Sequence, residues 1–202
     1  MPETGIGLFP DVGGGWYLPR KPGQIGMWLA LTGARIKAAD CIVAGIATHF
    51  MPSEILAAAR AQIAGAAQTH DPERALQTGL DALDEGAGKP KELTAENVER
   101  INRTFAGESV EAIVAVLEAD GSEWAKAQLK TLASKSPQTL KVSFRQLREG
   151  AQMATFAEEM RHEYRIAARV VQRPDFLEGV RALIVEKDNQ PKWNPPTLAG
   201  VA

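Results

Sequence analysis

Cysteine is almost absent from this chain, and its scarcity limits the kinds of site that the chain can build. Cys41 is the only cysteine among 202 residues. One thiol cannot form an internal disulfide, and it argues against a cysteine-rich zinc site. The three histidines, His49, His70 and His162, are spread apart without metal-ligand spacing to carboxylates. We therefore expect no metal site.

Membrane spans and nucleic-acid binding are also disfavoured. No apolar run approaches the roughly 20 residues that a helix needs to cross a bilayer. The 23 basic residues are balanced by 25 acidic ones, a net charge of -2, which argues against a chain that neutralises nucleic-acid phosphates. The first five residues show neither the basic start nor the apolar stretch of a secretory signal. We expect a cytoplasmic protein, or a mitochondrial matrix protein if the source is eukaryotic.

Glycine is concentrated at the start of the chain, where nine of its 18 copies lie within residues 1–45. Because glycine lets the backbone turn tightly or approach a neighbour closely, this segment is predicted to form loops around a site. Residues 45–50 are the best strand candidate, and residues 85–93 are the expected exposed linker.

The rest of the chain is predicted to be helical. Asp71-Pro72 and Ser136-Pro137 are typical of a helix N-cap followed by proline, and Thr155 with Glu158 fits a capping box. The expected helices are 24–32, 37–44, 53–68, 72–84, 95–106, 109–119, 122–134, 138–149, a long helix from Thr155 to about 171, and 175–184.

Two faces are predicted for the long helix. Its apolar residues follow spacings of three and four and therefore share one face; they are Phe156, Met160, Tyr164, Ala167 and Val171. The charged residues on the other faces are expected to be solvated; they are Glu158, Glu159, Arg161, Glu163 and Arg165.

Residues 3–15 are the best candidate for chemistry. Glu3 and Asp11 bracket an apolar turn. Two carboxyl groups in apolar surroundings can have their pKa values driven apart by desolvation and mutual repulsion, which suits acid–base catalysis. A surface turn with two solvated acids fits the same spacing, so spacing alone leaves both interpretations open. Gly13-Gly14-Gly15 lacks the lysine of a P-loop and the spacing of a dinucleotide fingerprint.

The run Met-Pro-Glu-Thr-Gly-Ile-Gly-Leu-Phe-Pro-Asp-Val-Gly-Gly-Gly resembles a signature of the crotonase (enoyl-CoA hydratase/isomerase) superfamily. Within it the chain is most similar to the 3-hydroxyisobutyryl-CoA hydrolases. The likeness continues in family order over nearly the whole chain, in patches at 29–33, 44–49, 136–147, 163–165, 175–182 and 187–193.

The resemblance implies an α/β crotonase-like fold, of which this chain would hold a mostly helical portion with very few short strands. Residues 1–50 would form the active-site segment and the end of the core. Residues 51–202 would form the helical C-terminal region of the same fold.

The resemblance also implies a chemistry. Glu3 matches the family's catalytic glutamate, and Asp11 matches the second acid that marks the hydrolase branch. The implied reaction is hydrolysis of an acyl-CoA thioester, 3-hydroxyisobutyryl-CoA of valine breakdown, in which both acids contact the substrate. Glu3 either attacks the thioester carbonyl or activates a water, and Asp11 orients the substrate hydroxyl or the water. Coenzyme A is part of the substrate, and no cofactor is implied. Lys187 is expected to be solvated, the alternative being contact with a CoA phosphate.

The sequence departs from the family in lacking the half that precedes the Pro-Glu motif. That half carries the oxyanion hole, and each oxyanion donor is typically worth about 3 kcal/mol. We therefore expect the isolated chain to be inactive or impaired. Met1 fits an internal position of the family pattern, so we expect the C-terminal portion of a longer protein, whose partners are an acyl-CoA and either the missing N-terminal half or another copy of itself.

Two other functions stay open. An enoyl-CoA hydratase or isomerase is one, although Asp11 and residues 187–193 argue against it. A non-catalytic helical subunit or interaction module is the other, and the missing oxyanion hole supports it.

Overall fold

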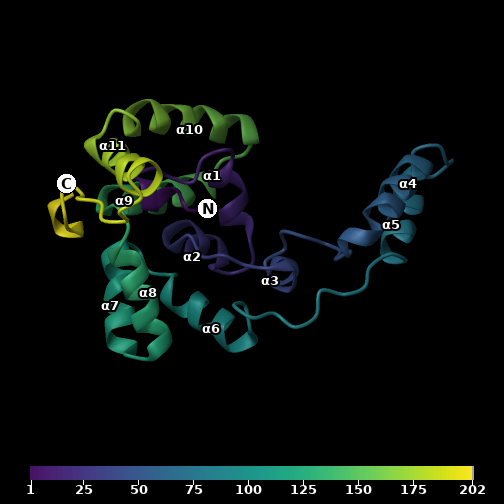
Figure 1. Ribbon diagram of the computed structural model, residues 1–202, viewed down its shortest axis with the longest axis horizontal. Coiled ribbons are helices and arrows are strands. Elements are labelled where there is room, and N and C mark those ends of the chain that lie inside the picture. Colours follow the sequence, from purple (N-terminus) through teal and green to yellow (C-terminus); the bar gives the residue numbers. More distant parts are fainter. Residues whose placement is uncertain (202) are drawn as a thin grey trace. The chain divides into compact units, whose positions relative to one another are not determined.

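The computed structural model describes residues 1–201, and within them every regular element is a helix (Figure 1). The chain divides into two compact units. The main unit comprises Met1–Arg35 and the chain from Val98 onward, and the inserted unit comprises Ile36–Asn97. None of the described helices is long and apolar enough to span a membrane.

The main unit contains the candidate site and most of the core. Its elements in chain order are η1 (Glu3–Ile6), α1 (Gly14–Tyr17), η2 (Leu18–Arg20), α2 (Ile25–Thr32), the end of α6 (Ala95–Thr104), α7 (Val110–Asp120), α8 (Glu123–Ala133), α9 (Pro137–Gly150), α10 (Phe156–Val170), α11 (Pro174–Val180), the π-helical turn η4 (Arg181–Val185) and η5 (Leu198–Gly200).

Helix α9 is the centre of the main unit. It contacts α1 and α2 as well as η1. Every residue of α2 is buried, and α9 buries apolar side chains such as Leu140, Phe144 and Leu147. Burial of a side chain of that size contributes about 1.5–3 kcal/mol. Residues 3–32 therefore pack against α9 through η1, α1 and α2.

The inserted unit contains α3 (Ala38–Val43), η3 (Ser53–Ile55), α4 (Leu56–Ala66), α5 (Pro72–Asp81) and the start of α6. Helices α4 and α5 pack against each other (Figure 1). The predicted linker 85–93 is not helical and is mostly exposed. Its end is fixed because Asp40 accepts hydrogen bonds from three successive backbone N–H groups, of which that of Leu93 is the shortest at 2.8 Å.

The predicted helices and caps are confirmed. The side chain of Asp71 accepts a hydrogen bond from the Arg74 N–H, and Ser136 Oγ accepts one from the Thr139 N–H. Thr155 and Glu158 form the predicted capping box. Because each cap satisfies a backbone donor that the helix leaves without a partner, it fixes where the helix begins.

The prediction of a strand over residues 45–50 is wrong. Gly45 has φ 62° and ends α3 in a left-handed turn, after which the chain runs as bends and coil. A strand needs a neighbouring strand to pair its backbone groups, and residues 1–201 contain none. The very few short strands expected for this chain are thus not found in the described part. The division of roles at residue 50 stays a prediction.

The predicted faces of α10 are also wrong in part. Phe156 is 42% exposed and Tyr164 is 76% exposed, and Val171 after the helix end is exposed too. Glu159 and Glu163 are buried, although a solvated position was predicted for both. The other charged side chains of the predicted solvated set are exposed as expected: Glu158, Arg161 and Arg165.

Candidate functional site

The two predicted catalytic acids flank one short segment. Glu3 opens η1, and Asp11 lies in the turn that precedes α1. Gly7 ends η1 with φ 70°, and a methyl group there would lie 2.2 Å from the backbone oxygen of Asp175. Only glycine fits this approach, so η1 is seated directly on the start of α11.

Glu3 has the environment of a functional carboxyl group. Its side chain is half-buried, and its Oε2 atom is buried without a hydrogen-bond partner. Burial raises the pKa of Glu3, and the negative charge of Asp11 acts in the same direction, against a backbone hydrogen bond and the N-terminal charge. A raised pKa makes the carboxylate a stronger base, so the position suits proton abstraction.

Asp11 belongs to a tight turn of unusual backbone conformation. Val12 has φ 50° and Gly13 has φ 85°, two left-handed residues in succession. The Gly14 N–H closes the turn by donating to the Asp11 carbonyl at 2.9 Å. A β-branched residue rarely adopts positive φ, at a cost of order 1–3 kcal/mol, so Val12 is held there by its surroundings.

Two buried side chains hold the backbone on either side of the Asp11 turn. Gln146 of α9 donates through Nε2 to the Pro10 carbonyl at 2.9 Å. The Gly13 N–H donates to Glu163 Oε2 of α10 at 2.8 Å. Asp11 and Val12 are thus the two residues between these anchors.

Glu159 lies beside these anchors and is fully buried. Its Oε1 atom is 3.5 Å from Gln146 Nε2, and its Oε2 atom has no partner. Burial raises the pKa of Glu159, and the negative charge of Glu163 adds to the shift, while the hydrogen bond from Gln146 and then the charge of Arg20 oppose it. A methyl group on Gly15 would lie 2.3 Å from Glu159 Oε1, so the absence of a side chain at Gly15 leaves the space that the Glu159 carboxyl group reaches.

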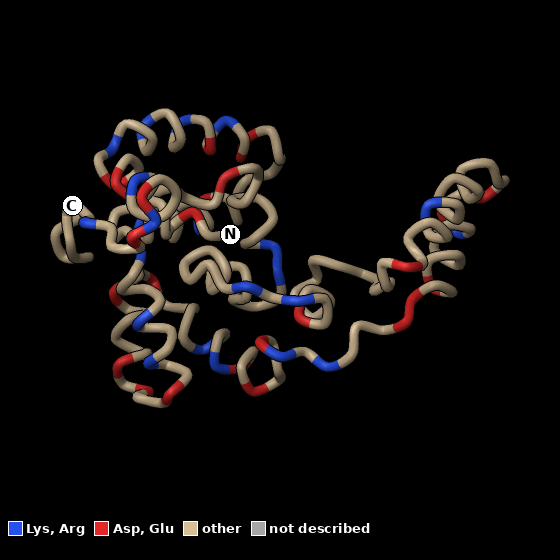
Figure 2. The backbone as a smooth tube through the Cα atoms, in the orientation of Figure 1, with Lys and Arg blue, Asp and Glu red and all other residues tan. Residues whose placement is uncertain are grey.

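Three residues of this site were not predicted from the sequence: Gln146, Glu159 and Glu163. A solvated position is expected for both acids because they lie off the predicted apolar face of α10, a helix that carries acidic and basic residues along its length (Figure 2). The available signal was that Glu159 and Glu163 are one turn apart on one face, while Gly13 to Gly15 require a close neighbour.

A hollow of about 400 Å³ adjoins the Glu3 turn. Gly5 lines it from η1, Leu183 from η4, and Trp193 from the C-terminal segment. The ammonium of Lys135 lies nearby, 3.5 Å from where a methyl group on Gly5 would stand, and burial lowers the pKa of Lys135.

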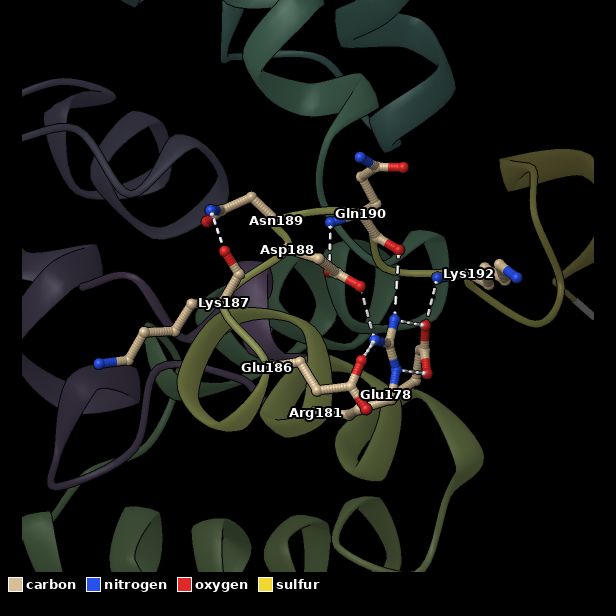
Figure 3. Close-up of polar contacts among 8 residues, drawn as sticks. All are labelled: Glu178, Arg181, Glu186, Lys187, Asp188, Asn189, Gln190 and Lys192. Atoms are coloured by element: carbon tan, nitrogen blue, oxygen red, sulfur yellow. Dashed lines mark hydrogen bonds and ion pairs between the residues drawn. The ribbon is translucent and has the colours of Figure 1, made fainter.

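Residues 189–191 and 193 line the other side of this hollow, and the chain that leads to them is held by Arg181 (Figure 3). The guanidinium binds both oxygens of Glu178, at 2.7 and 2.9 Å, and Asp188 at 2.6 Å, and it also pairs with Glu186. Hydrogen bonding to Arg181 lowers the pKa of Glu178 to about 2. Glu178 also accepts the Lys192 N–H at 2.8 Å.

Lys187 is exposed, and its side chain points away from the Arg181 cluster (Figure 3). This placement agrees with the expectation of a solvated lysine. Among the residues that the structure describes, no group of three or more His, Cys, Asp or Glu side chains could hold a metal ion.

The chain matches one protein family over its whole length. Residues 1–202 match the family model described as enoyl-CoA hydratase/isomerase. The chain is 44% and 46% identical, over its full length, to mitochondrial 3-hydroxyisobutyryl-CoA hydrolases of Xenopus laevis and Danio rerio. It spans about half the length of these curated relatives, 52% and 53%.

A solved structure is similar in fold. The crystal structure of a carnitinyl-CoA dehydratase from Mycobacterium thermoresistibile superposes with a TM-score of 0.85 at 33% identity, covering 100% of this chain and 55% of that one. The arrangement of helices is therefore crotonase-like, although the residues described here contain no strand.

Proposed function

Because the chain belongs to the enoyl-CoA hydratase/isomerase family, we propose that it carries the acid–base side of an acyl-CoA thioester hydrolase site, with 3-hydroxyisobutyryl-CoA as the substrate. The observation that carries this proposal is the pair of acids: Glu3 is half-buried with an unpartnered oxygen, and its pKa is raised mainly by burial, with a smaller contribution from the charge of Asp11. The names of the relatives support the choice of substrate.

The reaction consumes one water and releases coenzyme A as a free thiol and the hydroxy acid. On one route Glu3 takes a proton from water as the water attacks the thioester carbonyl. On the other route Glu3 attacks the carbonyl itself, and water then hydrolyses the resulting anhydride. On both routes the carbon–sulfur bond breaks, and a proton from the consumed water ends on the coenzyme A thiolate to give the free thiol. The raised pKa of Glu3 strengthens the base that the first route needs. On both routes Asp11 orients the substrate hydroxyl or the water.

The donors that stabilise the thioester oxyanion would come from outside residues 1–202. The chain spans about half of its curated relatives, and the resemblance assigns the oxyanion hole and the sheet of the α/β fold to the preceding half. We propose that this half, or a second polypeptide that supplies it, is the partner required for turnover. The relatives are named as mitochondrial, which supports the mitochondrial matrix as the location if the source is eukaryotic.

The test compares two reactions of the protein expressed from its complete reading frame. Release of free thiol from 3-hydroxyisobutyryl-CoA reports hydrolysis, and loss of enoyl-thioester absorbance from crotonyl-CoA reports hydration. We expect thiol release, lowered at least 100-fold by Glu3→Gln and at least tenfold by Asp11→Asn.

An exposed acid provides the matched control. Glu123 is exposed and pairs with Lys126 on the surface of α8, so Glu123→Gln should leave thiol release unchanged. Turnover of crotonyl-CoA alone would contradict the hydrolase proposal.

An enoyl-CoA hydratase or dehydratase is the second candidate, because the similar solved structure is titled a carnitinyl-CoA dehydratase. Such a reaction adds or removes water across a carbon–carbon double bond and leaves the thioester intact. Asp11 weighs against it, since typical hydratases have a small residue at this position of the family pattern. The same pair of assays separates the two candidates.

A further inference from the structure

We propose that Gln146 and Glu163 are positioning residues that fix the carboxyl group of Asp11 by holding the backbone on both sides of its turn. This proposal rests on the proposed function only for the role of Asp11 in hydrolysis. Neither side chain would touch the substrate. Each acts on a backbone group next to the Asp11–Val12 pair, the Pro10 carbonyl and the Gly13 N–H.

The strength of the anchors follows from their surroundings. Gln146 is 1% exposed and Glu163 is 7% exposed, so water does not compete for either hydrogen bond. The bond from the Gly13 N–H ends on a carboxylate oxygen at 2.8 Å, and a charge-assisted bond is roughly twice as strong as a neutral one. A buried N–H that lost this acceptor would have no replacement.

The need for anchors follows from the backbone between them. Val12 is 77% exposed, so its side chain packs against little that could hold it in the left-handed conformation. A strained conformation persists only where its neighbours determine it. Here the neighbours are fixed from α9 and α10, two helices distant in sequence, so the direction of Asp11 depends on how those helices pack.

Glu159 provides the matched control for Glu163. Both acids are buried on α10 one turn apart, but Glu159 contacts Gln146 and the Gly15 backbone, whereas Glu163 accepts the Gly13 N–H. Glu159→Gln keeps the shape of a buried side chain that touches no backbone donor of the Asp11 turn. A general effect of altering this buried cluster would appear in Glu159→Gln as well, whereas a positioning effect would appear only in variants of Glu163 and Gln146.

The first measurement is amide hydrogen exchange by NMR on the full chain. Glu163→Leu should speed exchange of the Gly13 N–H at least tenfold relative to the Leu140 N–H, which bonds to the Ser136 carbonyl in α9. Glu163→Gln keeps an acceptor without the charge and should give an intermediate rise of about threefold. Glu159→Gln should give none. Equal changes at Gly13 and Leu140 would show a loss of stability alone and would overturn the proposal.

The second measurement reads Asp11 itself. Its carboxyl ¹³C resonance should move in Glu163→Leu and in Gln146→Leu, and should stay in place in Glu159→Gln. If Glu163→Leu does not fold, Glu163→Gln decides the question, since an unchanged Gly13 exchange rate in that variant contradicts the proposal.

Kinetics connect the anchors to catalysis. In the hydrolase assay Glu163→Leu should lower kcat at least tenfold with KM changed less than threefold, and adding it to Asp11→Asn should cost nothing further. An additive loss would overturn the proposal. If the wild-type protein releases no thiol, the proposed function fails, while the exchange and ¹³C measurements still decide whether the anchors hold Asp11.

Discussion

The β-branched side chain of Val12 disfavours the left-handed backbone conformation that this residue adopts. It is β-branched with φ 50°, and most of it is exposed. We expect Val12→Gly to raise the free energy of unfolding by about 1 kcal/mol, because relief of 1–3 kcal/mol of strain exceeds the entropy that glycine adds to the unfolded chain. Urea denaturation measures the change.

A valine in ordinary helical geometry gives the opposite expectation. Val116 lies within α7 and is partly exposed. Val116→Gly should lower the free energy of unfolding by about 0.5–1 kcal/mol. Destabilisation of both variants would show that Val12 is not strained.

Glu159 gives a prediction on pH at the same scale. Its pKa in the folded protein is raised above the ordinary 4.5, mainly by burial. Between those two pKa values the folded state binds more protons than the unfolded state, so the free energy of unfolding falls as pH rises from about 4.5 through the raised value. Glu159→Gln removes this loss.

The measurement is urea denaturation of both proteins at pH 4.5 and pH 8. The stability advantage of Glu159→Gln over the wild type should grow at the higher pH. The exposed Glu123→Gln should show no such growth. An advantage that is constant with pH would contradict an elevated pKa for Glu159.

Arg181 acts at the scale of one element, the turn of residues 186–192 that follows η4. It binds Glu178 of α11, which precedes that turn, and Asp188 within the turn. Arg181→Met keeps the length of the side chain and removes the ion pairs. The Lys192 N–H donates a hydrogen bond to Glu178, and we expect this N–H to exchange at least tenfold faster in the variant. Arg145→Met, which removes an exposed pair with Glu149, should leave it unchanged.

The Arg181 cluster also has an expected pH range. The pKa of Glu178 is lowered to about 2 from an ordinary 4.5. Its stabilising effect is therefore complete above about pH 4.5 and is lost as pH falls from there through about 2. Protection of the Lys192 N–H that fell already between pH 7 and pH 5 would contradict this assignment.

Helices were predictable from the sequence where local signals decide them, and their packed faces were not. Asp71, Ser136 and Thr155 marked helix starts because a cap acts on its own helix. The buried face of α10 depends on what its partner offers, here the Gly13 N–H and the Gln146 amide. A pattern of apolar residues contains no information about a donor 150 residues away.

The candidate site was predictable only with the family resemblance. From spacing alone, a solvated surface turn stayed an open interpretation of Glu3 and Asp11, beside that of a catalytic pair. The structure places both in one segment, with Glu3 half-buried and its Oε2 atom buried without a partner, a geometry that follows from long-range contacts of η1 with α11. The catalytic roles of the two acids stay predictions.

At the scale of the whole molecule, the two compact units should differ in local stability. In the inserted unit, α4 buries only Ala59 and Ala66, and α5 buries only Gly79. Small side chains remove little apolar area from water, so opening this hairpin costs little free energy. Helix α9 buries Leu140, Phe144 and Leu147 among others and opens only at a much higher cost.

Hydrogen exchange with mass spectrometry tests the difference. Peptides from α4 and α5 should exchange at least 100-fold faster than peptides from α9. Similar protection in both would show that the inserted unit is stabilised by interactions beyond its own buried side chains.

The close packing around α1 also restricts which substitutions related sequences can carry. A methyl group on Gly150 would lie 2.1 Å from the Gly15 carbonyl oxygen, and one on Gly15 would strike Glu159 and Gln146. A side chain at position 150 would therefore need the backbone of α1 to move, and one at position 15 would need smaller or displaced side chains at positions 146 and 159. An alignment of related sequences should show glycine kept at position 150, and glycine kept at position 15 wherever large side chains are kept at positions 146 and 159.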